Sequence, residues 1–130
     1  MTHEELKAAA VATLDRAYVP YSHFPVGAAL ECSDGTVFTG CNIENASYTP
    51  TICAERTAVS KAVSEGHRDF VRIVIAGRSE DFCVPCGVCR QVLREFAPEL
   101  EIICLNGAGE ERVFTLPELL PHSFGPEYLL

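Results

Sequence analysis

The sequence predicts an α/β fold in which helices cover both faces of a mixed five-stranded sheet, a three-layer α-β-α arrangement. Apolar residues recur with helical spacing in some segments and form short strand-like runs in others, so the elements follow the order α-β-β-α-β-α-β-β. Two strands meet at a hairpin turn and the later strands alternate with helices, which is typical of a mixed sheet with helices on its faces. A length of 130 residues is near the modal domain size, so residues 1–130 are expected to form a single domain.

The first three elements are a helix and a β-hairpin. Thr2 and Glu5 match a capping box, in which the hydroxyl and the carboxylate each accept a hydrogen bond from a free backbone N–H. Apolar residues then recur every three to four positions, as expected for a helix with one buried face. Asp34-Gly35 is a strong hairpin signal between two apolar runs. The predicted bounds are 3–17 for the helix, and 26–32 and 36–43 for the strands.

A second helix and a buried strand follow the hairpin. Thr51 is the expected cap of a helix over 51–65, and Gly66 is its expected end. Residues 70–76 form a continuous β-branched run, which is typical of a strand buried on both faces. The remaining predicted elements are a third helix over 86–97, strands over 101–105 and 112–116, and one helical turn over 117–120, before a tail with no element of its own.

The charge and the cysteine count disfavour several classes of function. Lys plus Arg is 10 and Asp plus Glu is 18, giving a net charge of −8, which disfavours polymeric nucleic acid because Lys and Arg hold phosphate backbones. No apolar stretch approaches the ~20 residues that span a bilayer, so no membrane partner is expected. Seven cysteines, an odd number, without a signal-peptide pattern argue against a secreted disulfide framework. The expected location is a reducing cytoplasm, where clustered cysteines indicate a metal or catalysis.

Two short segments carry the chemistry. Cys53 lies near the start of the second predicted helix, and Cys86 and Cys89 lie at the start of the third. Helix N-termini carry partial positive charge, which favours thiolate over thiol. Cys86 and Cys89 share one helix face because they are three residues apart, and Cys53 supplies a third sulfur. Three protein ligands leave the fourth tetrahedral position open, which is the arrangement of a catalytic zinc.

Glu55 and Arg56 have different expected roles beside such a metal. Side chains at i and i+2 do not share a helix face, so Glu55 is a poor fourth ligand to a metal held by Cys53. It is well placed beside a bound water, where a carboxylate can move protons. Three thiolates (−3) and Zn²⁺ (+2) sum to −1, and Arg56 can donate hydrogen bonds to the thiolates and offset that charge.

Four runs of the sequence resemble signatures of the small homotetrameric, zinc-dependent cytidine deaminases. Zinc deaminases combine a Cys or His and a nearby non-ligand Glu with a Pro-Cys-x-x-Cys segment. The similarity extends from about Tyr18 to Phe96 and includes a phenylalanine in the tail, and Val88 departs from it mildly, since Ala is more usual there. The four runs are Tyr21–Ala29, Gly40–Tyr48, Cys53–Ala58 and Pro85–Phe96.

The resemblance implies a cytidine deaminase-like fold and an enzyme that replaces the 4-amino group of cytidine or 2′-deoxycytidine by oxygen, releasing ammonia, as in pyrimidine salvage. A zinc-bound hydroxide would attack C4, and Glu55 would shuttle the protons. The implied partners are one Zn²⁺ per chain, a free pyrimidine nucleoside, and further copies of the chain in a homotetramer with shared sites. The implied zinc ligands are Cys53, Cys86 and Cys89, with Arg56 compensating their charge. The implied substrate contacts are Phe24, Asn42, Glu44 and Ala54, with Ala46, Tyr48 and Phe124 reaching a neighbouring subunit's site.

Other interpretations remain open at this point. A fourth thiol, Cys83, could turn the three-cysteine site into a closed structural one, although a structural-zinc binding module would have no use for Glu55. A thiol oxidoreductase would use the Cys-x-x-Cys pair alone. Within the deaminases, the alternative is a blasticidin-type or other small-molecule deaminase, although Asn42-Ile-Glu44 and Tyr48 fit a cytidine pocket better.

Overall fold

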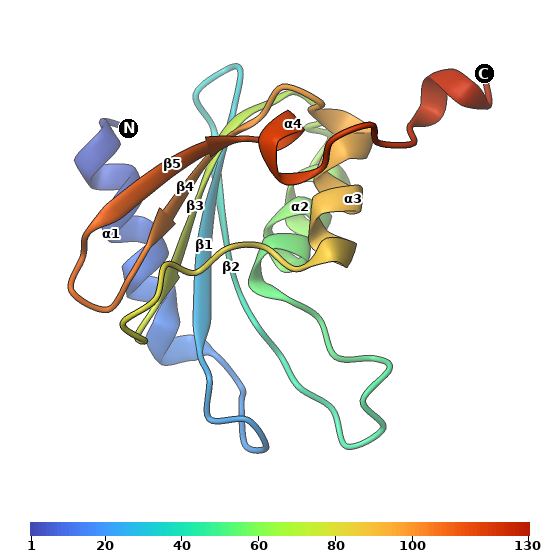
Figure 1. Ribbon diagram of the computed structural model, residues 1–130. Coiled ribbons are helices and arrows are strands. Elements are labelled where there is room, and N and C mark those ends of the chain that lie inside the picture. Colours follow the sequence, from blue (N-terminus) through green and yellow to red (C-terminus); the bar gives the residue numbers. More distant parts are fainter.

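The central strand of the sheet, β3 (Phe70–Gly77), explains why both faces of the sheet are covered. Its side chains alternate between two clusters of buried residues: Ile73 and Ile75 belong to one, Val74 and Ala76 to the other, and all four are at most 1% exposed. A strand that is apolar on both sides is stable only inside the molecule. In the computed structural model, which describes residues 1–130, helices cover both faces of this strand (Figure 1).

The sheet has five strands in the order β2-β1-β3-β4-β5, with one parallel pair, β3 and β4. The other neighbours are antiparallel, so the predicted mixed five-stranded sheet is confirmed. The hairpin is also confirmed, because Gly35 lies in the turn with a φ of 89° and donates to the carbonyl oxygen of Cys32 at 3.0 Å. The other strands are β1 (Val26–Cys32), β2 (Val37–Cys41), β4 (Glu101–Leu105) and β5 (Glu111–Thr115).

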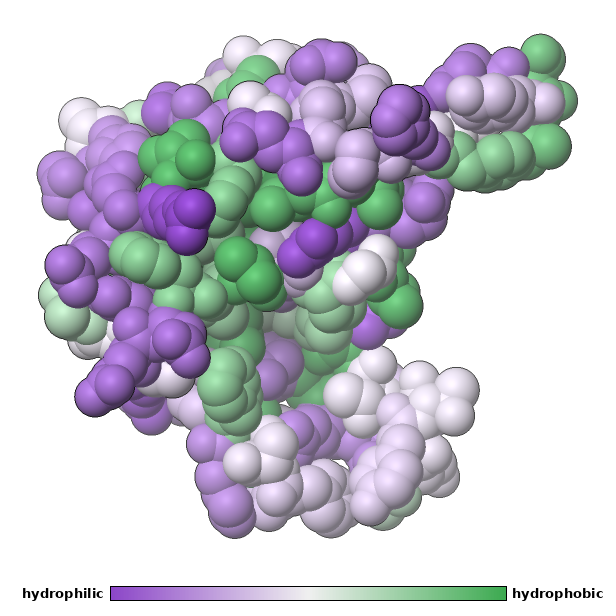
Figure 2. Space-filling model, in the orientation of Figure 1, coloured by the Kyte–Doolittle hydropathy of each residue, from purple (hydrophilic) through white to green (hydrophobic).

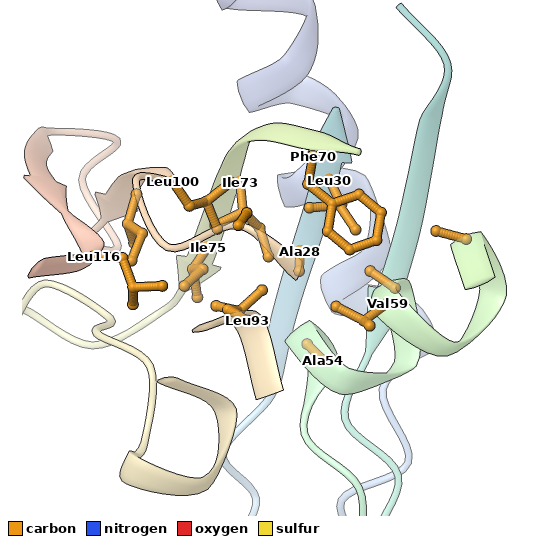
Figure 3. Close-up of a cluster of buried hydrophobic side chains, with 14 of the residues drawn as sticks. Ala28, Leu30, Ala54, Val59, Phe70, Ile73, Ile75, Leu93, Leu100 and Leu116 are labelled. Atoms are coloured by element: carbon orange, nitrogen blue, oxygen red, sulfur yellow. The ribbon is translucent and has the colours of Figure 1, made fainter. Parts of the chain in front are cut away.

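The helices form the two outer layers. α1 (His3–Ala12) packs on one face of the sheet through Leu6 and Ala10, in the cluster that contains Val74. α2 (Ala54–Ser64) and α3 (Gly87–Phe96) cover the other face, and α4 (Leu116–Leu119) follows β5 (Figure 1). Figure 3 shows Val59 of α2 and Leu93 of α3 in the cluster formed with Ile73. The predicted three-layer α-β-α arrangement is therefore confirmed.

Three details of the predicted elements are wrong. The first helix is α-helical only to Ala12 and continues as a 3₁₀ turn over Thr13–Arg16. The second helix begins at Ala54 with Cys53 as its cap, because the hydroxyl of Thr51 instead accepts a hydrogen bond of 3.1 Å from a backbone N–H of the preceding loop. The tail contains a 3₁₀ turn over Pro126–Tyr128.

The other predicted bounds differ from the structure by at most about two residues. No helix of the chain is both long enough and apolar enough to cross a lipid bilayer.

Candidate active site

The start of α2 is fixed by β2 and by the segment after it. Ile52 and Ile43 exchange two backbone hydrogen bonds of 3.0 Å, which hold the residue that precedes Cys53. Gly40 of β2 lies directly against the helix, since a Cβ at this position would be 2.4 Å from the carbonyl oxygen of Ala54. Only a glycine permits this approach of helix to strand. The first turn of α2 is therefore held at a fixed position beside the sheet.

α3 also begins at a cysteine. Cys86 is its N-cap, and the Sγ atom accepts a hydrogen bond of 3.5 Å from the backbone N–H of Cys89. Nε of Arg90 donates to the carbonyl oxygen of Pro85 at 2.8 Å, which ties the first turn of the helix to the chain before it. Both helices thus present a cysteine at an N-terminus, where the partial positive charge of the helix favours a thiolate.

The sulfur atoms of Cys53, Cys86 and Cys89 lie within 4.8 Å of one another, and those of Cys53 and Cys86 are 3.8 Å apart. Tetrahedral zinc with Zn–S bonds of about 2.3 Å places its sulfur ligands about 3.8 Å apart, so the spacing fits this metal. Cys83 does not belong to the cluster, which argues against the closed four-cysteine site. The donor set fits a zinc ion with three thiolate ligands and one open position.

Two of these thiols, those of Cys53 and Cys89, differ in their acidity. The hydrogen bond with Cys89, helped by Arg56 and Cys86, lowers the pKa of the Cys53 thiol to about 5. The same hydrogen bond, together with burial, raises the pKa of Cys89 above its ordinary value. Nη2 of Arg56 lies 3.5 Å from Sγ of Cys53, and this contact raises the pKa of the guanidinium group. Arg56 therefore lies where a cation can offset thiolate charge.

Glu55 is the buried acid of the site. It is 4% exposed, lines the cavity described below and takes part in no ion pair. Burial raises the pKa of its carboxyl group to about 7. A carboxyl group in this position can accept and release a proton next to the cysteine cluster.

A cavity of about 420 Å³ opens over the cysteine cluster. Of the residues predicted from the sequence, it brings together Phe24, Asn42, Ala54 and Glu55 with Cys53 and Cys86, whereas Cys89 is fully buried. Sequence reasoning missed several lining residues, most of them in the loop that precedes α3. The only signal for this loop in the sequence is that it ends at a metal-ligand candidate. The missed residues are Val26, Ser79, Asp81, Phe82, Cys83 and Val84.

Asn42 and Glu44 hold the segment that carries Phe24. Nδ2 of Asn42 donates to the carbonyl oxygen of Phe24 at 2.8 Å, and Oδ1 accepts from the backbone N–H of Val26 at 2.9 Å. Oε1 of Glu44 accepts hydrogen bonds of 3.1 Å from two backbone N–H groups of the same segment. Glu44 lines a separate cavity rather than the one over the cysteines. Both side chains therefore fix the position of Phe24.

The structure does not bring Ala46, Tyr48 and Phe124 to the cavity of their own chain. Tyr48 is 75% exposed, with a φ of 63°, and Phe124 is 54% exposed. The ring of Phe124 stacks on Tyr128 with 5.2 Å between centroids. Phe124 and Tyr128 belong to the C-terminal segment, which extends from the body of the molecule beyond α3 (Figures 1 and 2).

Comparisons with known proteins agree with this geometry. The family model described as "Cytidine and deoxycytidylate deaminase zinc-binding region" matches residues 1–105. The chain is 46% identical to a cytidine deaminase from Sporosarcina psychrophila over 130 residues, which cover 99% of this chain and 96% of that protein. The crystal structure of cytidine deaminase from Burkholderia pseudomallei is similar with a TM-score of 0.92 and 48% identity, over 95% of this chain and 100% of that one.

Proposed function

Because the chain belongs to the cytidine and deoxycytidylate deaminase family, we propose that it catalyses the hydrolytic deamination of cytidine and 2′-deoxycytidine to uridine and 2′-deoxyuridine, releasing ammonia. One observation carries the proposal: Glu55, a buried acid, lines the same cavity as two cysteines of a three-sulfur cluster. That combination suits attack of an activated water on an amidine carbon. The physiological role is pyrimidine salvage.

We propose that Cys53, Cys86 and Cys89 hold one zinc ion per chain. When bound, zinc lowers the pKa of a coordinated water and so supplies a nucleophile near neutral pH. Arg56 donates to Cys53 and offsets the charge of −1 that remains after three thiolates (−3) and Zn²⁺ (+2) are summed.

Glu55 moves the protons of the reaction. It removes a proton from the attacking water and delivers it to N3 of the pyrimidine as oxygen adds to C4. It then takes the second proton of that oxygen and passes it to the amino group, which leaves as ammonia when the C4–N bond breaks. The carboxyl group ends the cycle in the state in which it began. Its burial keeps bulk water from competing for these protons.

The nucleoside lies in the cavity over the cluster. Phe24 stacks on the pyrimidine, Ala54 lies against the base, and Asn42 binds the ribose hydroxyls in addition to its contacts within the chain. We also propose that Glu44 binds these hydroxyls, although it lines a separate cavity. Asn42 and Ala54 line the cavity over the cluster, which supports their assignment.

We propose a homotetramer in which Ala46, Tyr48 and Phe124 complete the site of a neighbouring subunit. Support comes from their exposure and from their absence from the lining of their own chain's cavity. Residues 1–130 act as one deaminase domain. The location is cytoplasmic, since all seven cysteines are free thiols, as expected in a reducing compartment.

The direct test is deamination by purified protein of known zinc content. Loss of cytidine absorbance should coincide with release of one ammonia per nucleoside, and 2′-deoxycytidine should behave alike. Protein that contains zinc but releases no ammonia from either nucleoside would contradict the proposal. Release from blasticidin or another amine alone would reassign the substrate while retaining the chemistry.

A further inference from the structure

The wall of the cavity over the cysteine cluster carries negative charge and no positive charge. The residues that line it include two acids, Glu55 and Asp81, and no Lys, Arg or His. Glu55 has a role in the proposed proton transfers, whereas Asp81 has none. A carboxylate that lines a mostly apolar substrate cavity without taking part in the reaction can still select which substrate enters.

Asp81 lies on a loop that is held at several points. The carbonyl oxygen of Ser79 accepts a hydrogen bond of 2.7 Å from Gly107, and the N–H of Cys83 donates to Leu105 at 3.0 Å. The carbonyl oxygen of Asp81 itself accepts from the hydroxyl of Ser79 at 3.2 Å. Its carboxylate takes part in no ion pair. The backbone of Asp81 is therefore fixed, while its charge is free to act on a ligand.

No side chain that lines the cavity offsets this charge, and the proposed zinc site, with three thiolates (−3) and Zn²⁺ (+2), is itself −1. Arg56 contacts Cys53 at 3.5 Å and does not line the cavity. Helix N-termini often bind phosphate groups, but the N-cap residues of the two that meet here, Cys53 and Cys86, are the proposed zinc ligands. The net charge of the whole chain, −8, has the same sign. A phosphate group brought into the cavity meets like charge.

We infer that Asp81 is a specificity-determining residue, which makes the site favour uncharged nucleosides over their 5′-phosphates. The inference rests on the proposed function, and it separates the two substrates that the family description names, cytidine and deoxycytidylate. Like charges in a cleft with apolar walls repel more strongly than in open water, because such walls focus the field. Phosphate sites commonly supply Arg or Lys, whereas this cavity supplies a carboxylate.

The test compares Asp81→Lys with Glu80→Lys, which is the same change of charge on the neighbouring residue. Glu80 lines a different cavity, beside Asn106 and Gly107. For wild type and each variant, kcat/KM is measured with 2′-deoxycytidine and with deoxycytidylate. We expect Asp81→Lys to lower the preference for the nucleoside about tenfold or more, the lower end of the effect of charge-lined clefts. Asp81→Asn should lower it less, and Glu80→Lys should leave it within about twofold.

Three outcomes would overturn the inference. The first is an unchanged preference in Asp81→Lys, and the second is an equal change in Glu80→Lys, which would assign the effect to the net charge of the chain. The third is a wild-type enzyme that deaminates the nucleotide as well as the nucleoside, a result that leaves the proposed function intact. Wild-type protein inactive on both substrates would instead remove the proposed function and the inference with it.

Folding can be separated from specificity in the same experiment. Asp81 and Glu80 are both exposed, so each Lys variant should unfold at the wild-type temperature and bind zinc equally. If the preference for the nucleoside changes while the unfolding temperature stays the same, the change comes from the charge at the cavity wall and not from altered folding.

Discussion

At the scale of single residues, Glu55 is the least exposed acidic side chain of the protein. It is 4% exposed, and burial raises the pKa of its carboxyl group to about 7. We expect Glu55→Gln, which keeps the shape of the side chain, to lower kcat at least about 10²-fold, because general acid–base groups contribute roughly that much or more. Zinc content and the unfolding temperature should stay at wild-type values.

The matched control for this prediction lies at the end of the same helix. Glu65→Gln removes the same charge from an exposed position at the C-terminus of α2 and should leave kcat unchanged. If Glu55→Gln kept more than about a tenth of the wild-type rate, the proton transfers would have to use another group.

The pairing of Cys86 with Cys89 could be predicted, because residues three apart at the start of a helix share one face. Cys53 caps a different helix, so its sulfur lies 3.8 Å from that of Cys86 only because the two helix starts pack together. Asp81 could not be predicted, because its loop follows a path set by hydrogen bonds to β4 and the turn after it. The hydrogen bonds between the Asn42 side chain and the segment of Phe24 could not be predicted either, because they also depend on the path of a loop.

At the scale of elements, the contact between α2 and β2 fixes the position of Cys53 in the cysteine cluster. A Cβ on Gly40 would lie 2.4 Å from the carbonyl oxygen of Ala54 and 2.6 Å from the nitrogen of Ala58, both backbone atoms that cannot move alone. We expect Gly40→Ala to lower the free energy of unfolding by about 1–3 kcal/mol, as overpacking does. Urea denaturation measures this, and zinc content should fall as α2 moves.

Gly87→Ala is the control for that prediction. Gly87 opens α3, and a Cβ there meets no atom within 4 Å, so this variant should be as stable as wild type or slightly more stable. Equal stability of Gly40→Ala and Gly87→Ala would show that α2 can shift away from β2 without loss.

The cysteine cluster also joins two elements, since one of its thiols belongs to α2 and two to α3. Metal binding energy is partly folding energy, so removal of zinc by a chelator should lower the unfolding temperature, and added zinc should restore it. Cys86→Ala should lose zinc, whereas Cys83→Ala should retain it, because Cys83 lies outside the cluster. Metal analysis showing that both variants lose zinc would instead favour the four-cysteine site.

Element types could be predicted more reliably than their ends. The residue pattern of β3 is enough to recognise a strand buried on both faces, because that burial is local to the strand. The start of α2 depends on a contact outside the helix: Ile52 pairs with Ile43, so the helix cannot begin before Cys53, although Thr51 is a good cap in isolation.

At the scale of the whole molecule, the strand order could not be predicted from the sequence. The parallel pairing of β3 with β4 and the position of β1 beside β3 join residues far apart in the chain. Local patterns determine which segments are strands, but packing of the helices on both faces determines which strands are neighbours. That order brings the loop with Asp81 and the segment with Phe24 to the same cavity.

The C-terminal segment gives the last prediction, which concerns assembly. Arg94 of α3 holds this segment through Ser123, at 2.7 Å, and through an ion pair with Glu127. Phe124 therefore has a fixed place, although it is 54% exposed and does not line the cavity of its own chain. If Phe124 completes the site of a neighbour, Phe124→Ala should raise KM several-fold, since stacking on a base contributes about 1–3 kcal/mol. Hybrids of Glu55→Gln and Phe124→Ala chains, formed by co-expression, should then contain sites with both residues intact and exceed the activity of the two variants assayed separately. Sedimentation of a fully active wild-type monomer, with no gain in the hybrids, would contradict the shared site and leave the zinc chemistry unaffected.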